Sequence, residues 1–320
     1  MRKISVIVPR GYVESVLSLA SEKCVDYWVN AESESGRQEV QLLVSAESTQ
    51  IVIDGLQTLL GHEVKARIVV IDVETTLPVV KESQPGRKGP ASSREELLSD
   101  LQKQSRMDSN FFLLVFLSTI AAAVGLIKDN VAVVIGAMVI APLLGPNLSL
   151  ALGTALGDRT LMWRSAGTNF VGLAITLVLS VALGLLWTAN LDSRELLSRT
   201  DVGLDSVALA LASGAAAVLS LTTGLSSVLV GVMVAVALMP PAVTLGLMLS
   251  AGQFDLASGA LLLLLINIVC VNFAACLVFF TKGIAPRTWR EKKAARNSML
   301  KAIAFWFVLL IAMLLIIQAR

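Results

Sequence analysis

The chain has 320 residues, of which 55% are hydrophobic and 16% are charged, and its mean hydropathy is +0.74. Soluble domains are closer to half apolar and a quarter charged, so this composition indicates an integral membrane protein. The net charge of +2 disfavours a strongly basic nucleic-acid-binding protein. Three cysteines without C-x-x-C spacing and a single histidine, His62, disfavour a disulfide framework and most metalloenzyme schemes. We therefore expect no nucleic-acid partner, no cofactor, no metal and no enzymatic activity.

Residues 1–75 alternate between β-rich and helical segments. The predicted segments, in chain order, are a strand at 4–8, a helix at 12–23, strands at 27–29 and 40–44, a helix at 51–60 and a strand at 65–74. This βαββαβ order is typical of the ferredoxin-like split motif, so we predict a ferredoxin-like α+β cytosolic domain. By analogy with other domains of this fold, we expect it to be regulatory and to favour a homo-oligomer.

The turn at Arg10 and Gly11 is the candidate regulatory-ligand site of this domain. It leads into the first helix, where free backbone N–H groups can hold an anion. The alternative is an ordinary strand-to-helix turn. His62 lies in a Gly-His-Glu turn and is expected in solvent.

Residues 76–92 are predicted to be a linker because of their proline and glycine content. Ser93 and Glu96 then form a capping box at the start of an amphipathic coupling helix predicted over 93–110. Leu97 and Leu101 give this helix an apolar side. We expect it to lie at the membrane surface or to pack against the N-terminal domain, and so to couple that domain to the membrane part. A solvated helix is the alternative.

Seven apolar runs follow that are suited to crossing a hydrocarbon core of ~30 Å, which takes about 20 residues of helix. They are residues 111–127, 131–152, 165–187, 206–223, 228–250, 257–281 and 300–318. The predicted basic cytosolic loop at 282–299 holds six Lys or Arg and one glutamate, whereas the loop at 188–205 holds four acidic and two basic residues. By the positive-inside rule, we expect a multi-pass protein of the inner (plasma) membrane with a cytoplasmic N-terminus.

The predicted spans repeat in two sets of three. With a shift of 95 residues, 118–150 falls on 213–245 with 11 identities in 33 positions, including Gly-x-Met-Val and a proline ten residues after its glycine. We predict membrane repeat 1 at 111–188, membrane repeat 2 at 206–281 and a seventh span at 300–320. Three spans per repeat make the second copy enter from the opposite side, as in the inverted repeats of many secondary transporters.

The second span of each repeat carries matching prolines. Pro142 and Pro146 lie on either side of Gly145 in the first, and Pro240 and Pro241 are adjacent in the second. A proline has no N–H and clashes with the carbonyl four residues back, so about one turn is predicted to unwind in each span. Backbone groups released inside a membrane must face protein, water or solute. The alternative is a pair of kinked but packed helices.

A new helix is predicted to begin after each break. Asn147 is the predicted cap of the first, and the segment at Pro241 and Ala242 is the predicted start of the second. Such helix starts favour anions, while the free carbonyls before them favour a cation such as Na⁺. Paired broken helices of this kind indicate a midplane binding site.

The candidate substrate-binding residues combine the two proline segments with amides and hydroxyls at similar depth. They are Pro142, Gly145, Pro146, Asn147, Ser149, Asn169, Pro240, Pro241, Thr244, Asn267 and Asn272. The core of the predicted spans has no Asp, Glu, Lys, Arg or His, which argues against proton coupling. Asp129 and Asp158, at predicted turns, are only marginal candidates for it.

One stretch carries a resemblance to a known family. Residues 133–146 read VVIGAMVIAPLLGP, and with the ferredoxin-like head and the linker they resemble the prokaryotic membrane proteins called domain of unknown function 389. The resemblance covers roughly residues 1–280. It implies a membrane protein and supplies neither a substrate nor binding residues.

The function we expect is transport of a small solute or ion, with a midplane site at the two broken helices and a cytosolic regulatory domain. The alternative is a ligand-gated channel or a membrane-anchored metabolite sensor. The expected partners are membrane lipid, the solute or ion (Na⁺ among the candidates), a small-molecule ligand of the head and further copies of the chain.

Overall fold

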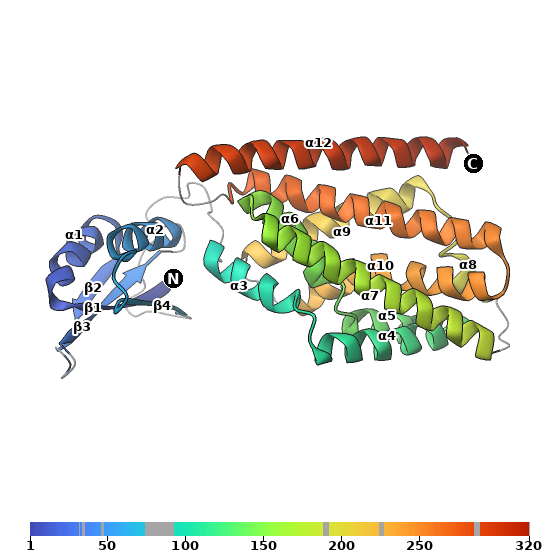
Figure 1. Cartoon of the computed structure of the whole chain (residues 1–320), viewed down its shortest axis with the longest axis horizontal. Coiled ribbons are helices and arrows are strands. Elements are labelled where there is room, and N and C mark those ends of the chain that lie inside the picture. The colour runs from blue at the N-terminus through green and yellow to red at the C-terminus, as the bar shows by residue number, and fades with distance from the viewer. Residues whose placement is uncertain are drawn as a thin grey trace. The chain divides into compact units, whose positions relative to one another are not determined.

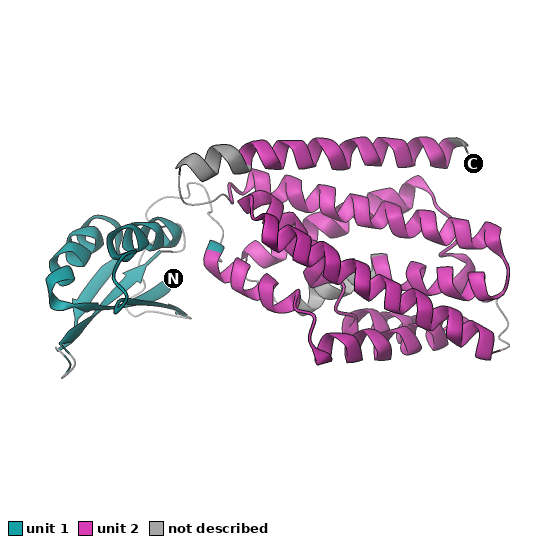
Figure 2. Ribbon diagram, in the orientation of Figure 1, with its two compact units in different colours: residues 1–94 teal, residues 95–320 magenta. Residues whose placement is uncertain are grey.

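The structure is a computed structural model that describes residues 1–31, 33, 36–45, 48–73, 93–187, 192–223, 227–284 and 289–319. The chain divides into two compact units, unit 1 at Met1–Arg94 and unit 2 at Glu95–Arg320 (Figure 2). The linker predicted at 76–92 lies outside the described residues.

Unit 1 has the element order βαββαβ that the sequence predicts. Its elements are β1 (Arg2–Pro9), a short 3-10 turn (Arg10–Tyr12), α1 (Val13–Lys23), β2 (Asp26–Val29), β3 (Arg37–Val44), α2 (Thr49–Leu60) and β4 (Arg67–Asp72). The strands form one antiparallel sheet in the order β2-β3-β1-β4. Both helices lie on one face of this sheet (Figure 1).

The core of unit 1 lies between the sheet and its helices. Alternate residues of β1, namely Ile4, Val6 and Val8, are fully buried against Val16 of α1 and Leu56 of α2. This period of two is what places one side of each strand in the core.

Arg94 ends unit 1 and begins α3 (Arg94–Gln104). Its guanidinium lies 3.0 Å from the Asp54 carboxylate, and its backbone N–H donates to the Gln50 side chain at 2.8 Å. These contacts hold Arg94 within unit 1, and the rest of α3 belongs to unit 2.

Cys24 follows α1, and burial raises the pKa of its thiol to about 11. Only the thiolate is nucleophilic, so at pH 8 we expect iodoacetamide to alkylate Cys24 roughly a hundredfold more slowly than free cysteine. The rate should rise about tenfold for each pH unit up to pH 11. The full-length Cys270→Ala/Cys276→Ala protein, followed by mass spectrometry, isolates this thiol. A rate equal to that of glutathione at pH 8 would show that the thiol is not desolvated.

The regular elements among the described residues of unit 2 are all helices. Its remaining elements are α4 (Ser109–Ile127), α5 (Val131–Ile140), α6 (Leu144–Leu156), α7 (Arg159–Leu186), α8 (Arg194–Leu197), α9 (Leu204–Thr223), α10 (Ser227–Ser250), α11 (Phe254–Thr281) and α12 (Trp289–Ala319). For residues 227–237, 289–295 and 319 the structure describes the helix but not the side chains. α12 begins at Trp289, so the helix extends into the segment at 282–299 that was predicted as a loop.

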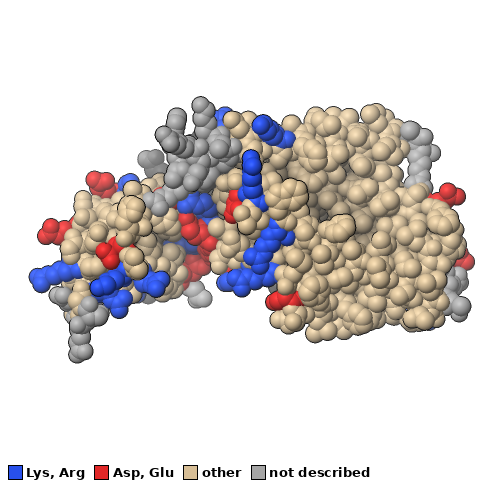
Figure 3. Space-filling view, viewed as in Figure 1, with Lys and Arg blue, Asp and Glu red and all other residues tan. Residues whose placement is uncertain are grey.

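Five of the described helices are long and apolar enough to cross a membrane, namely α4, α7, α9, α11 and residues 296–318 of α12. The bent pair of α5 and α6 makes a sixth candidate, and Leu238–Ser250 of α10 is a shorter apolar helix. The protein is therefore a helical membrane protein, and the count of seven stays a prediction. On the face shown in Figure 3, uncharged residues cover the flank of unit 2. Charged side chains gather at its two ends, mainly basic with some acidic at the end that carries α3, and acidic at the other.

The helix predicted over 93–110 ends earlier than expected, because α3 stops at Gln104 and α4 starts at Ser109. Asp108 caps α4 by accepting a hydrogen bond from the Phe111 N–H at 2.8 Å. Leu97 and Leu101 are buried in a cluster with residues of α6, α9 and α11. The apolar side of α3 thus packs on the membrane helices.

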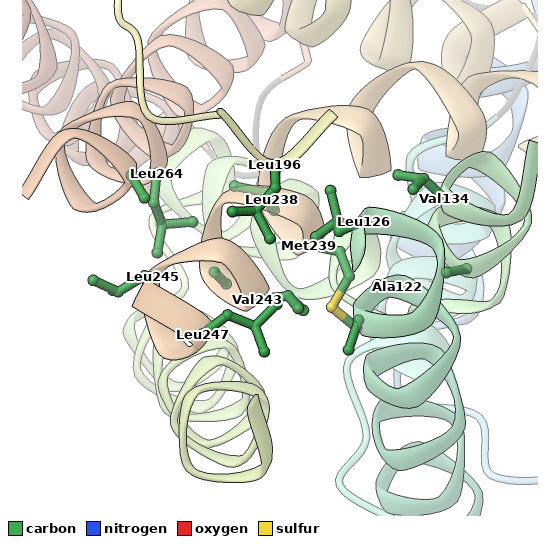
Figure 4. Packing of buried hydrophobic residues seen from close by; sticks show 14 of the residues in the cluster. Ala122, Leu126, Val134, Leu196, Leu238, Met239, Val243, Leu245, Leu247 and Leu264 are labelled. Carbon is green, nitrogen blue, oxygen red and sulfur yellow. The ribbon is translucent and has the colours of Figure 1, made fainter. Parts of the chain in front are cut away.

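The largest core of unit 2 joins α10 to α4, α5 and α11. Met239 of α10 is fully buried, and Figure 4 shows its side chain beside Ala122 and Leu126 of α4. Leu196 of α8 closes the same cluster, so the predicted loop at 188–205 contributes to the core.

Candidate functional site

The first predicted break is present. α5 ends at Ile140, α6 starts at Leu144, and the two axes are bent by 49°. Ala141, the residue before Pro142, is extended with φ −64° and ψ 122°. Proline disfavours the helical conformation in the residue before it, and Pro142 has no N–H for the Met138 carbonyl, so the interruption follows from the sequence.

The second predicted break is wrong as stated. α10 is one helix from Ser227 to Ser250 with Pro240 and Pro241 inside it. The preceding residue, Met239, is fully buried, and prolines are tolerated in spanning helices when neighbouring helices satisfy the backbone. No new helix begins at Pro241 and Ala242.

The two proline segments nevertheless meet α7 one turn apart. A Cβ on Gly172 would lie 2.8 Å from Leu143 Cδ2, so the α5–α6 break contacts Gly172. Four residues further on, the Thr176 hydroxyl lies 3.9 Å from Met239 Sδ. Gly172 is near the middle of α7, which has 28 residues and is therefore about 42 Å long. Both segments thus lie near the middle of α7.

Three of the four predicted asparagines form a connected network at this level. The Asn272 amide of α11 donates to Asn147 Oδ1 of α6 at 3.1 Å, and the Asn147 amide donates to Asn169 Oδ1 of α7 at 3.3 Å. Exposure is 0% for Asn272, 1% for Asn147 and 9% for Asn169. The network joins α6, just after the break, to α7 of the first predicted repeat and to α11 of the second.

Asn147 is the centre of this network and does not cap α6. The N-cap position is Leu143, which has no side-chain cap, and the Asn147 amide donates back to the Leu143 carbonyl at 3.1 Å. Asn147 lies three residues beyond the start of the helix, so its side chain reaches the carbonyls of the break rather than its N–H groups. It therefore stabilises the carbonyl side of the break.

Two buried oxygens beside these proline segments accept no hydrogen bond from the described residues. They are Asn272 Oδ1 and the Thr244 hydroxyl, and both residues are fully buried. The Asn272 nitrogen is fixed by its donation to the Ile268 carbonyl at 2.8 Å, so its oxygen must point elsewhere. A buried acceptor without a donor costs about 1–3 kcal/mol, which a solute, a water or a cation would offset.

The other predicted residues take different places. The Ser149 hydroxyl donates to the Leu101 carbonyl at 2.8 Å and so holds α3. Asn267 is five residues from Asn272 and about 140° around α11, beside the residues Ile266 and Cys270 that pack toward α9 and α12. Gly145 allows α6 to approach α3, since a Cβ there would be 2.5 Å from Gln104 Cβ.

The remaining candidates are three of the prolines and the two acidic residues at helix turns. Pro146, Pro240 and Pro241 are buried. The Asp158 carboxylate caps α7 by accepting from the Leu161 N–H at 3.0 Å, and Asp129 accepts from the Glu195 N–H at 2.8 Å. These two carboxylates hold turns at helix ends.

Sequence reasoning missed a set of buried hydroxyls on α7 and on α4 beside it. Thr119 of α4 donates to the Thr176 hydroxyl at 3.4 Å, and Ser180 donates to the Thr176 carbonyl at 2.6 Å. Thr168 donates to the Ser105 carbonyl at 3.0 Å. The sequence does contain a pattern that could have indicated them. Small or hydroxyl-bearing residues recur every four positions on one face of α7, namely Thr168, Gly172, Thr176 and Ser180.

In unit 1, Arg10 and Gly11 form the 3-10 turn before α1, and both are exposed. A Cβ on Gly11 would meet no atom within 4 Å. Their role as a ligand site stays a prediction.

Comparisons with known proteins identify relatives of this chain. The family model described as "Domain of unknown function (DUF389)" matches residues 138–273. The chain is 34% identical over 290 residues to the "Uncharacterized protein MJ0678" of Methanocaldococcus jannaschii, which covers 91% of this chain and 90% of that protein. No solved structure matches the chain significantly.

Proposed function

Because the chain belongs to the domain of unknown function 389 family, whose name assigns no activity, we propose a function from its site: transport of a small solute or ion across the plasma membrane. The observation that carries this proposal is the buried Asn147–Asn169–Asn272 network at the helix break, with the unpartnered Asn272 oxygen beside it. Polar side chains inside a membrane protein usually face its interior and mark solute paths.

The proposed substrate path follows the inverted repeat. In this proposal α4 to α7 form one repeat and α9 to α11 the other. The first repeat contributes Asn147 and Asn169 to the network, and the second contributes Asn272. The site carries amides and hydroxyls and no charged group, so it suits a neutral solute or a cation such as Na⁺ that replaces water by oxygen ligands. Rocking of one repeat against the other would then open the network to either side.

The regulatory part of the proposal rests on α3. This helix begins at Arg94, which pairs with Asp54, and Leu97 and Leu101 pack on the membrane helices. A ligand that shifts the ferredoxin-like domain would pull on α3, and α3 contacts the start of α6 through Gln104 and Gly145. In this proposal, α3 is the segment through which ligand binding in the N-terminal domain would act on the break.

Accessibility of the site from both sides of the membrane tests transport without a known substrate. Asn272→Cys and Thr244→Cys are made in a chain in which Cys24, Cys270 and Cys276 are alanine. A membrane-impermeant methanethiosulfonate reagent is then added to right-side-out and inside-out vesicles. A carrier is expected to be modified from both sides. Modification from neither side or from one side alone would contradict the proposal.

Val178→Cys is the matched control, because Val178 of α7 is 69% exposed on the outer surface of the helices. In a bilayer this thiol would face lipid and should stay unmodified from either side. Currents through single reconstituted proteins would instead favour the channel alternative.

A further inference from the structure

A cavity of about 420 Å³ lies over the helix break of unit 2, on the side of α3. Its wall includes Lys103, Arg106, Phe111, Leu114, Val139 and Pro142. The wall is formed by the end of α3 and the turn after it, the start of α4, the end of α5, the break itself, the first half of α6 and the end of α9. The cavity is distinct from the asparagine network, none of whose members lines it.

The polar end of this cavity favours an anion. Lys103 and Arg106 are exposed, and neither is in an ion pair with any described residue. The carboxylate of Asp108 is engaged by the Phe111 N–H at 2.8 Å. The first turn of α6, at Leu144 and Gly145, has no side-chain cap, so its N–H groups add a partial positive charge.

The other end of the cavity is apolar and continues onto the outer surface of α4 and α5. Leu114 is 37% exposed and Val139 is 46% exposed, whereas Phe111 and Leu148 beneath them are buried. Leu114 and Val139 belong to a wider set of exposed apolar side chains on these two helices, which a membrane would cover with lipid chains. An occupant that carried only charge would leave this wall without a partner.

We propose that this cavity binds one anionic phospholipid. Its phosphodiester lies between Lys103 and Arg106, where charge-assisted hydrogen bonds from ammonium and guanidinium groups suit phosphate oxygens. One acyl chain lies along Phe111, Leu114 and Val139. Because Ala141 and Pro142 form part of the same wall, the bound lipid also supports the bend between α5 and α6.

This binding does not depend on the transport proposal, and its test is separate. The full-length protein is purified in a maltoside detergent, and its unfolding temperature is followed as dioleoyl-phosphatidylglycerol or dioleoyl-phosphatidylcholine is added at equal mole fractions. A ligand that binds only the folded state raises this temperature. We expect phosphatidylglycerol to give a saturable rise and phosphatidylcholine a much smaller one.

Charge and shape are tested by three variants. Lys103→Gln/Arg106→Gln should weaken phosphatidylglycerol binding by about 30-fold, as expected from the attraction of two cations to an anionic lipid. Arg159→Gln/Arg164→Gln removes two exposed cations near the start of α7 that do not line the cavity, and it should leave binding within about twofold. Val139→Trp keeps both cations and fills the apolar wall from an exposed position, and it should abolish the rise.

Three outcomes would overturn the proposal. The first is an equal rise with the two lipids. The second is an equal loss of binding in the two double variants, which would indicate general surface charge. The third is the same rise with inorganic phosphate or glycerol 3-phosphate, which would show that the acyl chain contributes nothing. Native mass spectrometry of the Val139→Trp protein gives an independent count of bound lipid.

Discussion

Asn147→Leu is expected to lower the free energy of unfolding by about 2–4 kcal/mol. The variant removes two interhelical hydrogen bonds, to Asn169 and Asn272. Each such bond in a membrane protein contributes only about 0.6 kcal/mol, so these bonds are the smaller part of the effect. The larger part is the cost of leaving Asn169 Oδ1 buried without a donor, about 1–3 kcal/mol, whereas the Asn272 amide keeps its hydrogen bond to the Ile268 carbonyl.

A double-mutant cycle tests whether the three asparagines act as one network or independently of one another. Asn272→Leu alone should also destabilise, but Asn147→Leu/Asn272→Leu should cost less than the sum of the two, with a coupling of about 1 kcal/mol. The measurement is reversible unfolding in mixed micelles followed by tryptophan fluorescence. Asn267→Leu is the matched control, since it is the same change on the same helix about 140° away. It should add to Asn147→Leu without coupling, and equal coupling in both cycles would contradict the network.

The positions of the membrane helices could be predicted from the sequence to within a few residues. The runs at 206–223 and 257–281 correspond to α9 (Leu204–Thr223) and α11 (Phe254–Thr281). Prediction succeeds here because a lipid-facing helix must be apolar on every face, which is a local property of the sequence. The order of elements in unit 1 could be predicted for the same reason, because apolar residues recur with different periods in strands and in helices.

The site could be predicted only as a set of residue types. The sequence placed Asn147, Asn169 and Asn272 near the proline segments, but it could not tell that Asn267 faces another side of α11. Whether Pro240 breaks its helix depends on the packing around Met239 and not on the proline itself. Thr176 was missed because a threonine in an apolar run acquires its role only from the helices that meet it.

The cavity at the break could not be predicted either. It depends on the end of α3 lying against α6 and α7, where Ser149 and Thr168 donate to the Leu101 and Ser105 carbonyls. These contacts join segments more than 45 residues apart, and the sequence left three positions open for this helix. Short polar helices carry little hydropathy signal, so their docking is set by a few hydrogen bonds to exposed carbonyls.

Gly246→Ala is expected to destabilise the protein by about 1–3 kcal/mol, although alanine is the better helix former. Gly246 of α10 lies against the backbone of α7. A Cβ there would be 2.4 Å from Ser180 Cβ, 3.0 Å from the Leu177 carbonyl oxygen and 3.1 Å from the Val181 nitrogen. Two of these three atoms are backbone, so α10 must move away from α7. Such close helix approach is the usual role of small residues in membrane bundles.

Gly136→Ala is the matched control for this change. Gly136 of α5 is exposed, and a Cβ there would meet no atom within 4 Å, so only the helix propensity remains. We expect this variant to be neutral or more stable by up to about 1 kcal/mol, opposite in sign to Gly246→Ala. Gly246→Ala should also raise the labelling rate at Thr244→Cys, because α10 carries Thr244 and Met239 away from α7 as it moves. Equal unfolding temperatures for the two alanine variants would show that α7 and α10 do not pack as closely as the structure places them.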